Sequence, residues 1–353
     1  MLSYWERMAN AVIAFSEMLL LSQNFHFGLY APLVHRSALG SNINPFRQTN
    51  LTHYQDINFE TYFNYSIIQN GTFDLIPHSV YSNVNLNDSC NVFHVLIDYG
   101  GDNCSWSKNH YKIQSSVDIK CVPPFPSMKK TAHHEGKLFE YFQQIVDLGG
   151  QFCNNTVILY EWRKVGGLIG TPPLQKLVWS GLSDKVKMYS KQVISLLFGD
   201  EIYHTIQFRG GYFYRPSRVN KTLSQDEQMM ASLKKIFQAV PPGTKNIFFA
   251  TDMYSTIPEG SDKPDSIRSA ALETAMKYAY HSTGYNVRTL QNVSLSTSSS
   301  LDEITLAALV DAQIVMTSPT VTLIANSVYA NTLCEMNKNH YHGSCVWHKA
   351  YGE

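Results

Sequence analysis

Charged residues are scarce in this sequence, and neither sign is in excess. Only 16% of the 353 residues are charged, and the 28 Lys and Arg cancel the 28 Asp and Glu. A neutral chain has no overall positive field with which to attract nucleic acid or an anionic lipid surface. The 44% hydrophobic content excludes a disordered chain, because it provides enough apolar surface for a packed core. Any anionic ligand must therefore be captured by local groups.

The sequence also has no hydrophobic run of the roughly 18 residues that a membrane-spanning helix needs. The nearest candidate, residues 11–21, is interrupted by Ser16 and Glu17. It makes a poor signal peptide, since the charges ahead of it cancel and no small-residue cleavage site follows. We interpret residues 5–23 as an amphipathic helix. If the protein is luminal, we expect its targeting segment to be missing from this sequence or already removed.

Several catalytic motifs are missing too. No G-x-G-x-x-G follows a predicted strand, and G-x-x-x-x-G-K-[ST], G-x-S-x-G and H-E-x-x-H do not occur. These absences disfavour dinucleotide oxidoreductases, P-loop enzymes, α/β-hydrolases and zinc proteases. D-x-D is absent as well, which argues against a glycosyltransferase that holds its nucleotide sugar through a metal.

The six cysteines include no C-x-x-C, which disfavours a zinc ribbon or a thioredoxin-like motif. Cys334 and Cys345 would close a short C-terminal loop, and the other four lie in the N-terminal half. A zinc site of Cys345 with His340, His342 and His348 matches no known ribbon or finger spacing. Two interpretations stay open: disulfides in an oxidising compartment, or six reduced thiols in the cytosol.

Glycosylation sequons favour the oxidising compartment. Chance pairing of 24 Asn with 55 Ser and Thr gives roughly four N-x-[ST] motifs, and the sequence has eight. We therefore expect a glycoprotein of the secretory-pathway lumen, in the Golgi or endoplasmic reticulum, or a secreted one. The sequon asparagines are Asn50, Asn64, Asn70, Asn87, Asn103, Asn154, Asn220 and Asn292.

The two halves of the chain have different patterns. Residues 42–89 are rich in Asn, Tyr and Phe, which is typical of loops and irregular strands. We place the domain boundary near Pro172, between an N-terminal, acceptor-side domain (1–170) and a C-terminal domain (171–353). The elements predicted for the N-terminal half are strands at 91–99 and 156–162 and a helix at 135–148.

The C-terminal half alternates helices with strands. Such alternation predicts right-handed crossovers and a parallel sheet, so we expect a Rossmann-like domain. The predicted helices are 174–198 with a break at Gly181, 224–240, 265–281, 301–311 and 320–329, and the predicted strands are 203–208, 246–250, 285–289 and 313–317.

Polar residues follow three of these strands, where a parallel sheet binds its ligands. Arg209 follows the first strand, Asp252 follows the second, and Ser318 and Thr320 follow the last. Hydroxyls and free N–H groups at a strand-to-helix turn form an anion site, and arginine pairs with phosphate oxygens. Separately, each residue has an ordinary structural explanation, as a helix cap, an ion-pair partner or a turn residue. Together they predict a nucleotide-diphosphate site.

Four short segments resemble motifs of one enzyme family. Residues 250–252 read Ala-Thr-Asp, residues 207–211 resemble a His-x-Arg-x-Gly strand end, and residues 317–320 form a late Ser/Thr-rich turn. Residues 6–10 stand where a Gly-Arg-x-Gly-Asn motif is expected. In this order the segments resemble GDP-fucose-dependent fucosyltransferases, the protein O-fucosyltransferases and α-1,6-fucosyltransferases. The resemblance spans residues 5–335, apart from the middle of the N-terminal half.

The resemblance implies a GT-B-like α/β fold, with two Rossmann-like domains facing a cleft and a more irregular N-terminal half. It implies inverting, metal-independent transfer of fucose from GDP-fucose to a glycan or protein hydroxyl, with no cofactor besides this donor substrate. Arg209 would carry the phosphate charge as the catalytic residue, Ser318 and Thr320 would bind the phosphates, Asp252 the guanine or ribose, and Asn10 would line the cleft.

Departures from the family motif keep two alternatives open. The family's histidine is Gln207 here, and its frequent acidic residue is Tyr212. The protein could instead be a GT-B transferase for another nucleotide sugar, or an inactive, secreted glycan-binding protein. No general base stands out, although Asp98 and Glu161 follow strands of the N-terminal half. The acceptor, the disulfide pairing and the oligomeric state do not follow from the sequence.

Overall fold

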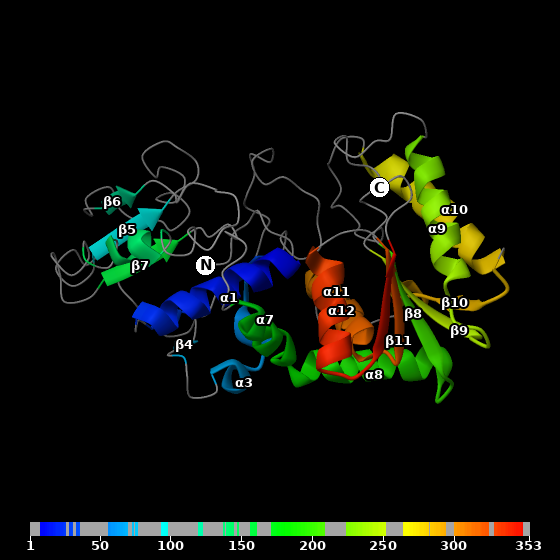
Figure 1. Ribbon diagram of the computed structural model, residues 1–353, viewed down its shortest axis with the longest axis horizontal. Coiled ribbons are helices and arrows are strands. Elements are labelled where there is room, and N and C mark those ends of the chain that lie inside the picture. The colour runs from blue at the N-terminus through cyan, green and yellow to red at the C-terminus, as the bar shows by residue number, and fades with distance from the viewer. Residues whose placement is uncertain are drawn as a thin grey trace. The chain divides into compact units, whose positions relative to one another are not determined.

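The computed structural model of the chain has an α/β fold (Figure 1). It divides into two compact units, Met1–Ala38 with Thr52–Gly181, and Leu39–Leu51 with Leu182–Glu353. The sequence placed the boundary near Pro172, whereas the helix that contains Pro172 belongs to the first unit, which runs to Gly181. The structure describes residues 8–25, 28–30, 33–35, 56–69, 73, 75–76, 93–97, 119–122, 137, 139–144, 147, 156–160, 171–208, 224–251, 264–281, 283–293, 300–324 and 328–348.

The first unit holds a small parallel sheet and two short strand pairs. The predicted strands at 91–99 and 156–162 are confirmed as β5 (Phe93–Ile97) and β7 (Thr156–Tyr160), with β6 (Ile119–Val122) unforeseen. The sheet order is β6-β5-β7. The remaining elements are α1 (Met8–Phe25), β1 (Leu29–Tyr30), β2 (Leu33–His35), β3 (Asp56–Asn58), η3 (Phe59–Thr61), α3 (Tyr65–Gln69), β4 (Leu75–Ile76) and α7 (Thr171–Ser180).

Helix α1 is enclosed on more sides than its predicted amphipathic character implied. It packs against α7, and Leu19 and Leu21 are fully buried. Ser16 and Glu17 are also fully buried, and the neighbouring Phe15 and Ser22 are nearly so, which leaves little of the helix exposed between residues 15 and 22. A helix that is buried nearly all round needs no polar face, and this explains its high apolar content. Among the described residues, no helix is long and apolar enough to cross a membrane.

The predicted break at Gly181 is confirmed, and its cause is a close approach. The N–H of Asn64 donates a hydrogen bond to the Gly181 carbonyl at 2.6 Å. A Cβ atom at this position would lie 2.6 Å from Cγ1 of the buried Ile68. Only glycine allows the backbone to come this near, so the chain ends α7 here.

The second unit is a five-stranded sheet of the order β10-β9-β8-β11-β12, and all of its pairs are parallel. In chain order this is 3-2-1-4-5, the arrangement of a doubly wound nucleotide-binding sheet. The Rossmann-like domain predicted for the C-terminal half is therefore confirmed. The strands are β8 (Tyr203–Phe208), β9 (Asn246–Thr251), β10 (Asn286–Arg288), β11 (Thr320–Ile324) and β12 (Ser344–His348).

Helices cover both faces of this sheet. Ile206 and Phe208 of β8 pack with residues of α9 and α10 in one apolar cluster. Alternate residues of a strand point to opposite faces, so Thr205 and Gln207 face the other side, toward α11. Figure 1 shows α9 and α10 on one side of the sheet and α11 and α12 on the other. The helices are α8 (Asp184–Phe198), α9 (Gln225–Gln238), α10 (Pro264–His281), η7 (Leu290–Asn292), α11 (Ser300–Thr317) and α12 (Val328–Asn339).

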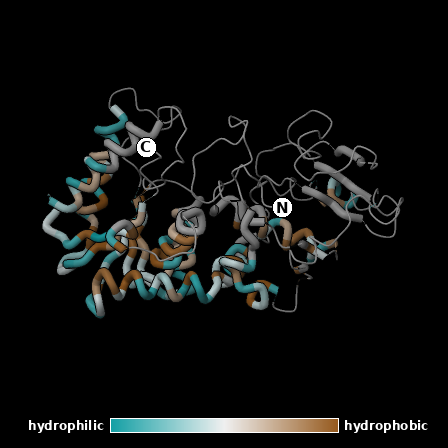
Figure 2. The backbone as a smooth tube through the Cα atoms, turned by 180° about the vertical axis from the view of Figure 1, so that it is seen from behind, coloured by the Kyte–Doolittle hydropathy of each residue, from teal (hydrophilic) through white to brown (hydrophobic). Residues whose placement is uncertain are grey.

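Local sequence explains where several helices begin and end. Ser183 caps α8, and Ser224 with Glu227 forms a capping box at the start of α9. Gly199 after α8 and Gly284 after α10 have φ values of +61° and +73°, which glycine adopts without a steric cost. Hydrophobic and hydrophilic residues alternate along the helices of this unit (Figure 2), as amphipathic packing on a sheet requires.

The prediction for residues 313–324 is wrong. Residues 313–317, expected as a strand, continue α11 to Thr317, and residues 320–324, expected as a helix, form β11. Near its end α11 is buried on all sides, from Ala312 to Met316, so this part of the sequence shows no helical period. The strand signal was the alternation of Thr and apolar residues in Thr-Val-Thr-Leu-Ile.

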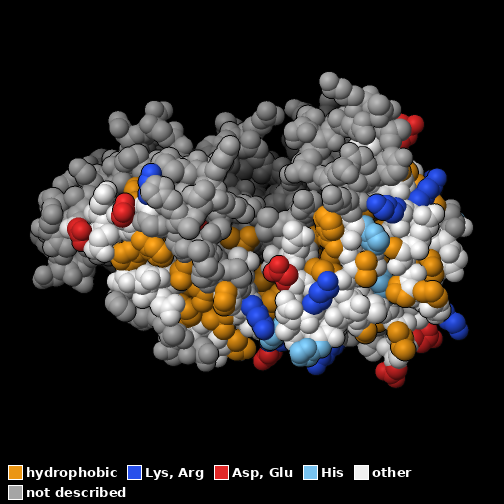
Figure 3. All heavy atoms as spheres, viewed as in Figure 1, with side chains coloured by type: hydrophobic (Ala, Val, Ile, Leu, Met, Phe, Trp, Pro, Cys, Tyr) orange, Lys and Arg blue, Asp and Glu red, His pale blue; other side chains and the backbone are white. Residues whose placement is uncertain are grey.

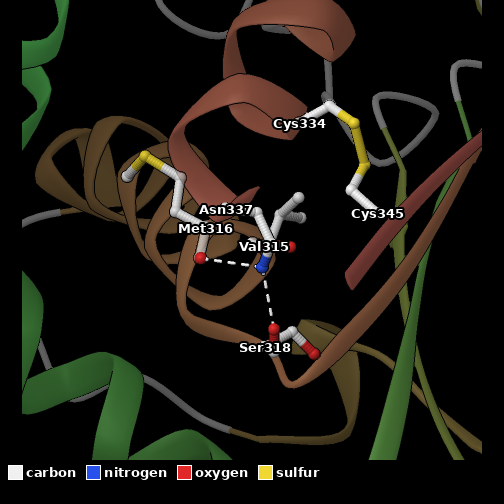
Figure 4. The surroundings of a disulfide bond; sticks show 6 residues. All are labelled: Val315, Met316, Ser318, Cys334, Asn337 and Cys345. Atoms are coloured by element: carbon white, nitrogen blue, oxygen red, sulfur yellow. Dashed lines mark hydrogen bonds between the residues drawn. A yellow bond between two sulfur atoms is a disulfide. The ribbon is translucent and has the colours of Figure 1, made fainter. Parts of the chain in front are cut away.

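One disulfide joins α12 to β12. Cys334 and Cys345 are bonded, with a Cα–Cα distance of 5.6 Å across 11 residues (Figure 4). This confirms the short C-terminal loop expected from the sequence. It also removes Cys345 from the zinc site considered with the neighbouring histidines.

Replacing Cys334 and Cys345 together by serine is expected to lower the free energy of unfolding by about 2 kcal/mol, because the unfolded chain regains the entropy of a short loop. Urea unfolding of the double variant measures this loss. Wild-type protein unfolded in dithiothreitol should show the same lowered midpoint, and an unchanged midpoint in both samples would contradict the prediction.

Candidate functional site

The carboxyl ends of four parallel strands meet in one row of register partners. His348 of β12 pairs with Ile324 of β11, Ile324 with Phe208 of β8, and Phe208 with Thr251 of β9. Open parallel sheets bind their ligands along this edge, outside the strand ends. We refer to the row His348, Ile324, Phe208 and Thr251 as the carboxyl edge.

The carboxyl edge includes the point where the strand order reverses. After β8, the chain adds β9 and β10 on one side and β11 and β12 on the other. The crevice of such a sheet opens between the first strand and the strand across the reversal, here β8 and β11. In the sequence, Arg209 follows β8 directly, and Ala325-Asn326-Ser327 connect β11 to the start of α12 at Val328.

Two predicted site residues follow neighbouring strand ends. Arg209 and Asp252 come directly after Phe208 and Thr251, which are register partners. Arg209 and Asp252 themselves lie outside the described residues, so their roles stay predictions. Asn10 lies in the first turns of α1, but its side chain is not described. Asp98 and Glu161 also lie outside the described residues, directly after the paired ends Ile97 and Tyr160.

The positions predicted for Ser318 and Thr320 are wrong. Because β11 begins at Thr320, both residues stand at the amino end of this strand, on the edge opposite the carboxyl edge. They lie in a helix-to-strand turn instead of a strand-to-helix turn. In the sequence, the residues that follow the carboxyl end of β11 are therefore 325–327, which were predicted to belong to a helix and lie outside the described residues.

Hydrogen bonds occupy Ser318 completely within the fold. Its side chain is 1% exposed, and its Oγ lies 2.7 Å from Thr205 Oγ1. Its carbonyl accepts a hydrogen bond from Asn337 Nδ2 at 2.8 Å. Desolvation raises the pKa of Tyr203, whose side chain also hydrogen-bonds Ser318. We assign Ser318 a structural role and omit it from the candidate site.

Thr320 is held in the same way by a buried histidine. Its Oγ1 lies 2.8 Å from Nδ1 of His204, and Oγ1 of Thr322 lies 2.8 Å from the other ring nitrogen. His204 is 2% exposed, and burial lowers its pKa from 6.5 to about 4. The ring is therefore neutral at pH 7, and it ties β8 to β11 at the amino end of both strands.

Within the described part of the chain, three buried polar atoms near the carboxyl edge have no hydrogen-bond partner: Gln207 Oε1, Trp347 Nε1 and His348 Nε2. Gln207, the next-to-last residue of β8, is 3% exposed, and its register partner Leu323 is in turn the partner of Trp347. Unpaired buried groups are rare in native proteins and are often reserved for a ligand or water. Sequence reasoning noted Gln207 only as a departure from a family motif, because lack of a partner is not visible in a sequence.

The described side chains of the carboxyl edge carry no charge. Desolvation lowers the pKa of His348, and the charge of Lys235 on α9 lowers it further. On the face shown in Figure 3, the described Lys and Arg side chains are interspersed with Asp and Glu. Within the part of the chain that the structure describes, no three His, Cys, Asp or Glu residues form a group that could hold a metal. An anion at this edge would therefore depend on Arg209 and on helix N-terminal donors.

Comparisons with known proteins identify the fold. No family model matches the chain, and no curated protein matches its sequence. The structure is similar to POFUT1 in complex with GDP-fucose, with a TM-score of 0.57 and 10% identity over 98% of this chain and 95% of that one. It is also similar to POFUT1 in complex with GDP, with a TM-score of 0.56 and 11% identity over 97% and 95%. NodZ fucosyltransferase from Bradyrhizobium matches with a TM-score of 0.45 and 10% identity over 94% and 90%. The α/β fold implied by the resemblance is thus confirmed.

Proposed function

We propose that this protein is a glycosyltransferase that transfers fucose from GDP-fucose to a hydroxyl group of a glycan or protein, with inversion and without a metal. One observation carries the proposal. In the 3-2-1-4-5 sheet, the neighbouring strands β8 and β9 end in register, directly before Arg209 and Asp252. The fold is similar to that of solved GDP and GDP-fucose complexes of POFUT1.

The chemistry requires stabilisation of a departing diphosphate. Breaking the bond between the sugar carbon and the phosphate oxygen places negative charge on GDP. Groups fixed in position for this charge stabilise the transition state more than the bound donor. In the proposed site, the Arg209 guanidinium pairs with phosphate oxygens, and the N-terminal N–H groups of α12 face the same crevice from β11. Ser318 and Thr320 have no part in it.

Gln207 and Asp252 have other roles in the proposed site. Gln207 is a neutral amide, so it can orient a ligand through its unpaired Oε1 but cannot carry charge or exchange a proton. Asp252 is proposed to bind the guanine or ribose of the donor. We propose that the enzyme works in the lumen of the secretory pathway as a glycoprotein, where the Cys334–Cys345 disulfide is stable.

Binding of GDP tests the proposed site directly. In EDTA, GDP should raise the melting temperature of the full chain by mass action, and UDP and ADP should not. Arg209→Ala should weaken GDP binding by about 10- to 100-fold, because it removes a charge-assisted contact worth about 1.5–3 kcal/mol. Isothermal titration calorimetry measures the change in Kd.

A second variant separates this contact from a general loss of charge. Lys191 lies exposed on α8, so Lys191→Ala removes one positive charge away from the carboxyl edge and should leave the Kd for GDP unchanged. Stabilisation by UDP instead of GDP would overturn the fucose assignment. If no nucleotide stabilises the protein, transferase activity itself is contradicted.

Transfer is tested separately, with radiolabelled GDP-fucose in EDTA and mixed peptide and glycan acceptors. Labelled product supports a metal-independent reaction, and NMR of its anomeric centre tests inversion. Hydrolysis of the donor without transfer to any acceptor would leave donor binding intact and contradict the proposed reaction.

A further inference from the structure

Two of the eight sequon asparagines belong to the described residues, and their surroundings differ. Asn64 is half-buried beside Gly181, and its Oδ1 accepts hydrogen bonds from the N–H and the hydroxyl of Ser66, within its own sequon. Asn292 is exposed at the end of η7. The two positions therefore offer very different space to a large modification.

The amide of Asn292 is fixed in one orientation. Its Oδ1 accepts a hydrogen bond from the N–H of Thr289 at 2.8 Å, which caps the start of η7. The hydroxyls of Thr289 and Tyr280 each lie 3.3 Å from the same oxygen. All three donors approach the carbonyl oxygen, so the oxygen faces the protein.

The Asn292 nitrogen is left available by this arrangement. No described residue accepts a hydrogen bond from Nδ2. The sequon continues with Val293 and Ser294, and its middle residue is not proline. An exposed sequon whose amide nitrogen meets no described acceptor, and whose carbonyl oxygen takes up the contacts with the protein, can accommodate an N-linked glycan in the folded state.

We propose that Asn292 carries an N-linked oligosaccharide, an inference that rests on the luminal location given above. In the reaction, the Asn292 Nδ2 attacks the anomeric carbon of a polyprenyl-diphosphate-linked oligosaccharide. A carbon–nitrogen bond forms, the carbon–oxygen bond to the diphosphate breaks, and Nδ2 releases one proton to a base of the separate enzyme that attaches the oligosaccharide. The lipid diphosphate leaves with the bonding electron pair.

The glycan is compatible with the native contacts of Asn292. Substitution on the nitrogen keeps the amide carbonyl, so the hydrogen bonds that Thr289 and Tyr280 donate to it remain. The sugar then extends into solvent just after β10, which is a terminal strand of the sheet. Terminal strands expose unpaired backbone groups to other chains, and a bulky polar group beside β10 hinders such pairing.

Site mapping tests the proposal on the full chain, secreted from eukaryotic cells behind an added signal peptide. Peptide N-glycosidase in ¹⁸O water converts a glycosylated Asn into ¹⁸O-labelled Asp. Cleavage after Arg288 and Glu303 releases a peptide, Thr289–Glu303, in which Asn292 is the sole asparagine. Mass spectrometry is expected to find the label in this peptide.

Two substitutions of Ser294 complete the test. Ser294→Ala should abolish the label while Asn292 and its hydrogen bonds remain, and Ser294→Thr should retain it. Absence of the label from wild-type Thr289–Glu303 overturns the proposal, whether or not other sequons are labelled. This readout does not involve GDP, so it can fail while the proposed transferase function stands, and the reverse is equally possible.

Discussion

Replacing Asn337 by aspartate is expected to destabilise the second unit by about 3–5 kcal/mol. The Asn337 side chain is fully buried in α12, and its Nδ2 donates to the carbonyls of Met316 at 2.9 Å and Ser318 at 2.8 Å, with Val315 at 3.3 Å (Figure 4). An aspartate would place a carboxylate against these oxygens. Urea unfolding at pH 7 measures the loss.

The sequence explains why α11 depends on a side chain from another helix. The Val315 carbonyl would ordinarily accept a hydrogen bond from the N–H four residues later, but that residue is Pro319, which has none. The last carbonyls of a buried helix must find another donor, because an unpaired one costs about 1–3 kcal/mol. Asn337 supplies that donor to α11.

A matched variant and a pH series make this expectation specific. Asn331 is exposed on the same helix, so Asn331→Asp introduces the same charge and should change stability by less than about 0.5 kcal/mol. Burial raises the pKa of a carboxyl above its unfolded value, so the penalty of Asn337→Asp should shrink as the pH falls toward 5. Equal midpoints for the two variants at pH 7 would contradict the role assigned to Asn337.

Local patterns in the sequence predicted most of the second unit. Residues 203–208 form the predicted strand, and the helices near 224–240 and 265–281 lie where the apolar period and Ser224 indicated. The two helices have one buried and one exposed side, so burial leaves a period in their sequences, whereas the short strand β8 is buried along nearly its whole length. The failure began in residues 313–316, which are all buried and show no such period.

The candidate site was harder to predict because its geometry depends on strand order. Arg209 and Asp252 were identified from their places after two strands, and those strands prove to be neighbours in register. Ser318 was assigned to the wrong edge of the sheet, because the strand that was predicted to end before it begins after it in the structure. Its contact with Thr205, 113 residues away, could not be deduced from local sequence.

His204 is expected to make the stability of the second unit depend on pH. Burial lowers its pKa from 6.5 to about 4, so the folded protein binds this proton less readily than the unfolded chain. The stabilisation is fully present above pH 6.5 and is lost as the pH falls toward 4. A change of this size corresponds to about 3 kcal/mol over the whole range, and to about 2 kcal/mol at pH 5.

Substitution by glutamine isolates this contribution. His204→Gln keeps a neutral side chain that can hydrogen-bond Thr320 or Thr322, but it does not titrate. The difference in unfolding free energy between wild type and variant should therefore change by about 2 kcal/mol between pH 7.5 and pH 5, in favour of the variant at the lower pH. Urea unfolding at several pH values measures this difference.

An exposed histidine provides the control. His281 ends α10 on the surface, so His281→Gln should differ from wild type by less than about 0.5 kcal/mol at every pH. If wild type and His204→Gln lose stability in parallel as the pH falls, the acid sensitivity belongs to other groups. A difference confined to His204→Gln would show that the buried, neutral ring between Thr320 and Thr322 makes the stability of the second unit depend on pH, and that the amino end of β11 serves the fold.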